Sequence, residues 1–183
     1  PEMEINLGSI GKGYALDRCA VLLEAAGIHD FLLHGGNSSV LARGLPSGAS
    51  APDGWRIGVR NPLRPDRRAG QLRLLNRALA TSGSGTQFFM HEGKRYGHII
   101  DPRSGWPAEG VLTASVIAPS GAEADALSTA FYVMGVERAR AYCAEHPEIA
   151  AILICPGRRA GSLEKHVIGL SPDEWQELEE ERE

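Results

Sequence analysis

Two oxygen-bearing side chains four residues apart, Asp125 and Thr129, are the first candidates for chemistry in this chain. Ser120 and Glu123 form a capping box just before them, which predicts a helix that runs to about Met134. On a helix this spacing places both side chains on one face. A carboxylate and a hydroxyl are hard ligands of the kind Mg²⁺ prefers, and waters and substrate phosphates can complete its octahedron.

A plainer interpretation of this pair is open, and spacing alone favours it. Asp125 would complement the dipole of the helix near its N-terminus, and Thr129 would bond back to a preceding carbonyl. In either case we expect Asp125 to be an exposed helix residue. Its replacement by Ala should then leave the fold intact, because exposed helix residues rarely carry stability.

A glycine-rich run, Gly8-Ser9-Ile10-Gly11-Lys12-Gly13, precedes another predicted helix. Backbone N–H groups at a helix start attract phosphate, and Lys12 adds a positive charge. The spacing is neither GxxxxGK[ST] nor GxGxxG, so the run matches neither of the common nucleotide loops. Taken alone, it is equally typical of an ordinary helix start.

The stretch 97–105 supplies His98 where an apolar strand meets a turn. Histidine titrates near neutral pH, so His98 is a candidate general base, although a lone histidine on a strand is more often structural. Asp101 is either a phosphate-site residue or the former of an Asx turn before Pro102, and spacing favours the turn. Ser82 either binds phosphate oxygens or belongs to a plain turn.

Apolar periodicity indicates the elements that would position these residues. It predicts helices over 12–26, 120–134, 136–145 and 172–183. It predicts strands over 28–34, 39–42, 55–60, 71–75, 78–82, 88–90, 95–100, 112–118 and 149–155. Strands in runs, with helices between some of them, predict an α+β fold with a mostly antiparallel sheet and packed helices. The length, without repeat or linker, favours a single domain over residues 1–183.

Composition argues against several classes of protein. A net charge of −4 without a basic stripe argues against a nucleic-acid partner. Cys19, Cys143 and Cys155 have no CxxC spacing, so we expect core cysteines and not a metal knuckle or a disulfide framework. No apolar run is long enough to predict a transmembrane helix.

The order of the motifs resembles that of the ApbE family of FAD:protein FMN transferases, formerly called thiamine-biosynthesis lipoproteins. The matching stretches are INLGSIGKGYALD (5–17), GGNSSVLARG (35–44), WRIGVRNP (55–62), ALATSGSG (78–85), RYGHIIDPRSGWP (95–107) and ADALSTAFYVMG (124–135). Each piece is unspecific, but the combination is highly specific and extends from residue 5 to about 155. The resemblance implies an ApbE-like, T-fold-related domain.

What the resemblance implies for function is Mg²⁺-dependent transfer of FMN from FAD to a threonine hydroxyl of an acceptor flavoprotein, with release of AMP. Asp125 and Thr129 match the metal-binding side chains of the DAxxT pattern. A backbone carbonyl in the stretch 9–11, assigned to Gly11, is the third expected metal ligand. His98 matches the histidine that activates the acceptor threonine. The residues expected at the flavin nucleotide are Gly8, Ser9, Gly11, Lys12, Gly13, Ser82 and Asp101.

The sequence also departs from the family pattern. The sequence does not include the long segment that usually precedes the first motif, so we expect it to correspond to the C-terminal portion of the family's usual length. Asn37 and Ser84 stand where GGD and SGD motifs have carboxylates, and Gly11 stands where IAKG has alanine. The alternatives that stay open are an FAD pyrophosphatase, a divergent or non-catalytic FAD-binding protein, and a structural α+β domain that has lost the site. Family members usually act outside the cytoplasmic membrane, which suggests a periplasmic or cell-envelope location, near the membrane through the acceptor.

Overall fold

A six-stranded antiparallel sheet is the centre of the computed structural model, which describes residues 6–49, 54–85 and 88–178. The strands, in spatial order, are β1 (Phe31–Gly35), β2 (Ser39–Arg43), β5 (Ala78–Gly83), β10 (Thr113–Ala118), β11 (Ala150–Pro156) and β12 (Leu163–Ile168). Every pairing in this sheet is antiparallel. The predicted α+β class with a mostly antiparallel sheet is therefore confirmed.

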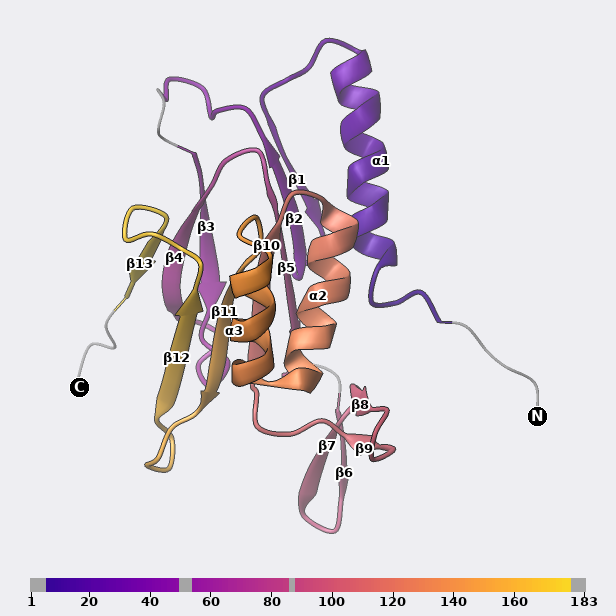
Figure 1. Cartoon of the computed structure of the whole chain (residues 1–183), viewed down its shortest axis with the longest axis vertical. Helices are drawn as coiled ribbons and strands as arrows, with labels where there is room; N and C mark the ends of the chain where they lie inside the picture. Colours follow the sequence, from indigo (N-terminus) through magenta and orange to yellow (C-terminus); the bar gives the residue numbers. More distant parts are fainter. Residues whose placement is uncertain (1–5, 50–53, 86–87, 179–183) are drawn as a thin grey trace.

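Three helices cover one face of this sheet (Figure 1). They are α1 (Gly11–Ala25), α2 (Gly121–Met134) and α3 (Val136–Glu145). Helix α1 contacts β1 and β2, α2 contacts β5 and β10, and α3 contacts β11. The core between helices and sheet contains Phe131 of α2 with Leu41, Val116 and Leu153 of the strands. Among the described residues, no helix is long and apolar enough to cross a membrane.

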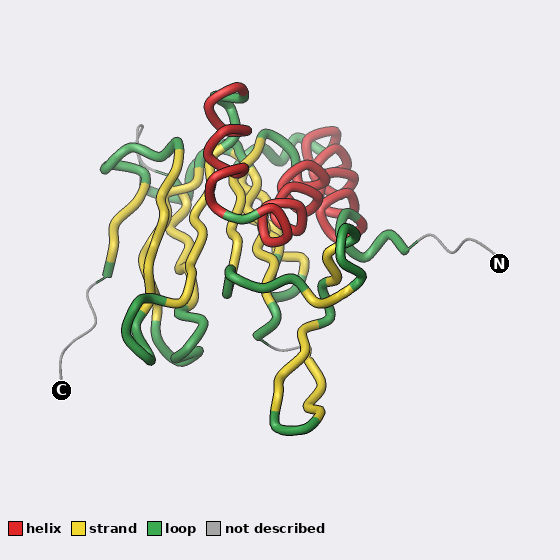
Figure 2. Tube along the Cα trace, turned by 60° about the horizontal axis from the view of Figure 1, so that its bottom comes forward, coloured by secondary structure: helices red, strands yellow, loops and turns green. Residues whose placement is uncertain are grey.

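A second sheet covers the other face (Figure 2). It contains three strands in the order β13 (Trp175–Glu177), β4 (Arg68–Leu74) and β3 (Trp55–Arg60). Its core residues Ile57 and Leu72 pack with Ile152 of β11. Because β11 is covered on both faces, it is a continuous buried apolar run and does not alternate.

Two small hairpins project beyond the C-terminal end of α2 (Figures 1 and 2). They are formed by β6 (Phe88–His91) with β7 (Lys94–Gly97) and by β8 (Ile100–Asp101) with β9 (Trp106–Pro107). Glu92 and Gly93 both have positive φ, as in the tight type I′ turns that match strand twist. The first hairpin was predicted, but its second strand ends at Gly97. His98 therefore lies in a bend, not in a strand over 95–100.

The predicted helix over 172–183 is wrong for the described part of that range, and residues 179–183 lie outside the described residues. Trp175–Glu177 forms strand β13, in which Trp175 pairs with Leu72 of β4. Trp175 is 8% exposed and packs so closely on Gly70 that a Cβ there would lie 2.2 Å from its ring. Burial of this one large side chain outweighs the helix propensity of the surrounding glutamates.

Smaller differences concern bounds and cysteines. Strand β1 begins at Phe31 and not at residue 28, and β12 was not predicted. Cys143 and Cys155 are buried, and burial raises the pKa of both thiols. Cys19 is exposed, contrary to the expectation of three core cysteines. Helix α1 buries Gly13, Leu16 and Ala20 instead, and Cys19 lies off that face.

The first turns of α1 and α2 lie against each other with their backbones in contact. A Cβ built on Gly13 would lie 1.9 Å from the carbonyl oxygen of Gly121. A Cβ built on Gly121 would lie 2.5 Å from the carbonyl oxygen of Gly13. Only glycine allows this approach, so these two residues set the distance between the helices.

Replacing Gly13 with Ala is expected to destabilise the fold, because the new methyl group overlaps a backbone carbonyl that cannot rotate away. Overpacking of this kind costs about 1–3 kcal/mol. Gly11→Ala is the matched control, since a Cβ at residue 11 meets no heavy atom within 4 Å. Urea unfolding followed by circular dichroism compares the two variants. Equal unfolding midpoints for both would contradict the close packing.

Candidate functional site

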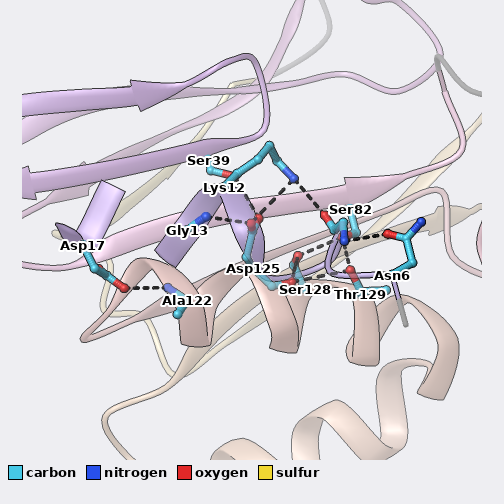
Figure 3. A network of polar contacts seen from close by, with 11 residues as sticks. Asn6, Lys12, Gly13, Asp17, Ser39, Ser82, Ala122, Asp125, Ser128 and Thr129 are labelled. Carbon is cyan, nitrogen blue, oxygen red and sulfur yellow. Dashed lines mark hydrogen bonds and ion pairs between the residues drawn. The ribbon is translucent and has the colours of Figure 1, made fainter. Parts of the chain in front are cut away.

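Helices α1 and α2 cap each other's N-termini with one aspartate each (Figure 3). Asp125 of α2 accepts a hydrogen bond at 2.8 Å from the backbone N–H of Gly13 in α1. Asp17 of α1 accepts from the N–H groups of Gly121 and Ala122 in α2, at 2.7 and 2.9 Å. First-turn amides have no partner within their own helix, so each carboxylate satisfies donors that would otherwise be open.

The two helices differ in the caps they supply themselves. Helix α1 begins after Ile10, which makes no side-chain cap, so Asp125 acts in its place. Helix α2 has the predicted cap, because Ser120 accepts from the N–H of Glu123 at 3.2 Å. Asp17 adds to that cap from outside the helix.

Asp125 is buried, and both of its carboxylate oxygens have partners. It is 4% exposed, and Oδ1 accepts from Ser39 Oγ at 2.8 Å. Lys12 Nζ lies 3.6 Å from Oδ2 and also donates to the carbonyl of Gly8 at 3.3 Å. The half-exposed ammonium balances the buried charge, since an unpaired buried carboxylate is costly. The expectation that Asp125 is an exposed helix residue is therefore wrong, and the reason for expecting its replacement by Ala to leave the fold intact no longer holds.

Thr129 lies one turn further along α2 and shares a hydroxyl cluster with strand β5. Ser82 Oγ lies 2.9 Å from Thr129 Oγ1 and 2.8 Å from Ser128 Oγ. Thr129 Oγ1 also bonds weakly, at 3.5 Å, to the backbone carbonyl of Asp125, as the plainer interpretation expected. Ser82 belongs to β5 and not to a turn. The structure thus brings five of the predicted site residues close together, namely Lys12, Gly13, Ser82, Asp125 and Thr129.

Ser9 and Gly11 lie at the start of α1, beside this cluster. Ser9 is exposed in the turn before the helix, and Gly11 is the first helical residue. The N–H of Gly11 donates to the carbonyl of Leu7 at 2.8 Å, which closes the turn that carries Gly8. The glycine run is therefore a helix start, as both interpretations of it required.

Asp101 lies at the other end of α2 and forms the turn that spacing favoured. Its Oδ1 accepts from the backbone N–H of Arg103 at 2.9 Å, and its carboxylate accepts from Arg103 Nε and Nη2. Arg103 Nη2 also donates to the carbonyl of Val133 at 3.2 Å, which docks the turn on α2. The contact with Val133 places this turn at the C-terminal end of α2, whereas Asp125 lies near its N-terminal end.

His98 is exposed in the bend that leads into this turn. Next to the turn, an open groove of about 390 Å³ is lined by Tyr96, Asp101, Ser104, Trp106, Pro107, Ala108 and Glu109. Tyr96 stacks on Phe89 with ring centroids 5.1 Å apart and lies 6.4 Å from the ring of Trp106. The exposure of His98 in the bend leaves it accessible to an acceptor of some size.

A divalent cation fits the donor chemistry around Asp125. Among the described residues, no group of three or more His, Cys, Asp or Glu side chains gathers to bind a metal. A cation here would instead be held by one carboxylate, one hydroxyl and a backbone oxygen, all of them hard ligands suited to Mg²⁺. The ammonium of Lys12 beside Asp125 shows that this position already favours positive charge.

Three further residues of this network were not predicted from the sequence: Asp17, Ser39 and Ser128. The spacing between Gly13 and Asp17 is the same as that between Asp125 and Thr129. This repeated spacing was the sequence signal that could have pointed to Asp17. Ser39 meets Asp125 across 86 residues of sequence, and no local pattern indicates such a contact.

The profile of the ApbE family matches residues 1–153. The FAD:protein FMN transferase of Treponema pallidum is 36% identical over 165 residues, a match that covers 86% of this chain and 45% of that protein. The FAD:protein FMN transferase of Escherichia coli K12 is 34% identical over 142 residues, covering 76% of this chain and 39% of that protein.

Solved structures show the same likeness. The crystal structure of the ApbE protein of Thermotoga maritima has a TM-score of 0.75 and 33% identity, covering 88% of this chain and 51% of that one. The flavin transferase ApbE from Vibrio cholerae has a TM-score of 0.75 and 29% identity, covering 92% and 52%. The chain thus spans about half the length, or less, of the relatives it matches.

The turn at Asp101 generates a pH prediction. Hydrogen bonds from Arg103 lower the pKa of Asp101 from its ordinary 3.8 to about 2. A folded pKa below the unfolded value stabilises the turn above pH 3.8, and this contribution is lost as the pH falls through 2. Carbon-13 NMR of the carboxyl group should give a midpoint near 2 in the wild type and a higher midpoint in Arg103→Gln, which loses the side-chain hydrogen bonds and the charge but keeps the backbone N–H of residue 103. An unchanged midpoint in the variant would show that Arg103 is not the cause.

Proposed function

The chain belongs to the ApbE family, and on this premise we propose that it acts in Mg²⁺-dependent transfer of FMN from FAD to a threonine hydroxyl of an acceptor protein, with release of AMP. The observation that carries the proposal is the gathering of Lys12 and Gly13 from α1, Ser82 from β5, and Asp125 and Thr129 from α2. Relatives named FAD:protein FMN transferase support the reaction class.

Lys12 is the residue best placed to meet the phosphates of FAD. Its ammonium is half-exposed at the N-terminus of α1, where the helix dipole also favours negative charge. The N–H of Gly13 is already engaged by Asp125, so the lysine has to supply much of the attraction. Residues 8–11 form the turn in front of it, where a pyrophosphate can approach the backbone closely.

Asp125 and Thr129, with the backbone carbonyl of Gly11, would hold Mg²⁺. When bound, the ion supplies charge neutralisation at the pyrophosphate. Ser39 and Gly13 hold the carboxylate of Asp125 in place, and Ser82 holds the hydroxyl of Thr129, by the hydrogen bonds described above. Ligands fixed in this way by a second layer of hydrogen bonds bind metal more tightly than free ones.

His98 is proposed as the general base. Its neutral imidazole takes the proton of the acceptor threonine, whose oxygen then attacks the phosphorus of the FMN half of FAD. The bond from that phosphorus to the bridging oxygen breaks, and AMP leaves. The exposure of His98 supports this role, because the acceptor is itself a protein and must reach the base. With water as the nucleophile, the same site would act as an FAD pyrophosphatase.

Asp125→Asn should remove Mg²⁺-dependent FAD turnover while keeping the chain folded. The amide retains a carbonyl oxygen for Ser39 or Gly13 but loses the charge that a cation needs. We expect a loss of turnover larger than the roughly 10- to 100-fold that follows from mutating an outer-shell partner of a metal ligand. Asp173→Asn, at an exposed acidic residue of the C-terminal segment, is the matched control. Turnover is followed by separating FAD, FMN and AMP, and circular dichroism checks that each variant is folded. The metal assignment fails if the Mg²⁺ dependence of Asp125→Asn equals that of the wild type.

His98→Ala should slow FMN transfer to a threonine-containing acceptor by about 10²- to 10⁴-fold, the usual contribution of a positioned base. FAD affinity, measured by calorimetry, should stay near the wild-type value because the proposed role of His98 is toward the acceptor threonine and not toward the FAD phosphates. His166→Ala, on strand β12, serves as the control. Undiminished transfer by His98→Ala would refute the catalytic assignment.

A further inference from the structure

We propose that Tyr132 is a positioning residue for His98 and acts through Ser84 and Gly97. The inference rests on the proposed function, in which His98 is the general base. It adds a residue of the core that touches neither FAD nor acceptor, and it explains how the bend at His98 is held at a fixed distance from Asp125 and Thr129.

Tyr132 is a buried residue of α2 with a polar end. It is 2% exposed, and its phenol Oη donates a hydrogen bond at 3.0 Å to Ser84 Oγ. A buried phenol needs such a partner, because leaving its hydroxyl unpaired is costly. Ser84 directly follows strand β5, so this bond ties the end of β5 to α2.

Ser84 in turn lies against the residue that precedes His98. A Cβ built on Gly97 would lie 2.7 Å from Ser84 Cβ and 3.4 Å from Ser84 Oγ. Gly97 is the last residue of β7, where it pairs with Phe88. The serine side chain thus packs on bare backbone, and its position sets where β7 ends and the bend at His98 begins.

The far end of the same segment is held by the next residue of the helix. Arg103, fixed by Asp101, donates to the carbonyl of Val133 at 3.2 Å. Consecutive residues of α2 therefore hold both ends of the stretch 98–103, Tyr132 through Ser84 and Val133 through Arg103.

Helix α2 carries the proposed metal ligands as well as these two attachments. Asp125, Thr129, Tyr132 and Val133 recur at the i, i+4, i+7, i+8 spacing of one helix face. A helix is rigid and rises about 1.5 Å per residue, so Thr129 and Tyr132 are about 4.5 Å apart along its axis. The helix thereby fixes the spacing between the metal ligands and the base, and a misplacement of about 1 Å can cost about 100-fold in rate.

This arrangement also gives a structural reason for the serine at position 84. It stands where the family motif has a carboxylate, in contact with a tyrosine that is almost fully buried. A serine hydroxyl can accept the hydrogen bond from the phenol without placing an additional charge beside the core.

The test compares Tyr132→Phe and Ser84→Ala with Tyr142→Phe, which removes a tyrosine hydroxyl from α3 and keeps its ring. Histidine ¹³Cε1–¹H NMR is the first readout and does not depend on activity. We expect the His98 resonance to shift or broaden in Tyr132→Phe and Ser84→Ala and to stay in place in Tyr142→Phe. The resonances of the other five histidines should not change in Tyr132→Phe.

The second readout is FMN transfer from FAD. Tyr132→Phe should be about 10- to 100-fold slower than the wild type, with FAD affinity retained. In a His98→Ala background, the same substitution should cause no further loss, because the tyrosine acts only through the histidine. Tyr132→Phe and Ser84→Ala combined should be no worse than Ser84→Ala alone, because Ser84→Ala already removes the hydrogen bond that Tyr132→Phe removes.

Several results would overturn the proposal. An unchanged His98 resonance in Tyr132→Phe would do so, as would an equal loss of rate with and without His98. Changes spread over all histidines, with a lower melting temperature, would instead assign Tyr132 a general role in the core. If the wild type itself transfers no FMN, the proposed function fails, while the resonances still decide whether Tyr132 positions His98.

Discussion

The contact between the first turns of α1 and α2 is the constraint on which the rest of this structure depends. Gly13 and Gly121 bring two backbones together, and at that distance each helix can reach the open N-terminal amides of the other. Asp17 and Asp125 fill these positions reciprocally. A side chain larger than hydrogen at either glycine would separate the helices and leave both carboxylates without their donors.

This arrangement gives Asp125 two roles that compete for the same atoms. Its carboxylate caps α1, and it faces the ammonium of Lys12 at the edge of the cluster. A buried anion with donors on one side and a half-exposed cation on the other is stable and still open to a second cation. The same side chain therefore stabilises the fold and carries the proposed chemistry. For this reason, a loss of activity in a variant of Asp125 is informative only when the stability of the fold is measured as well.

Local sequence patterns predicted much of the fold and the local turns and caps beside the candidate site, but not the contacts between distant segments. The capping box of α2 and the turn at Asp101 were predictable because their partners lie within three residues. The burial of Asp125 was not, because Gly13 lies 112 residues away in sequence. Strand β13 was missed for a similar reason, since the burial of Trp175 depends on a distant glycine in β4.

Amide hydrogen exchange tests the central claim most directly. First-turn amides of a helix normally exchange fast, because they lack acceptors. The reciprocal caps predict that the amides of Gly13, Gly121 and Ala122 exchange as slowly as those in the central strands. The first-turn amides of α3, whose N-cap Gly135 offers no side-chain acceptor, should exchange rapidly and serve as an internal reference. Exchange of the Gly13 and Gly121 amides at the rate seen in the first turn of α3 would contradict the account.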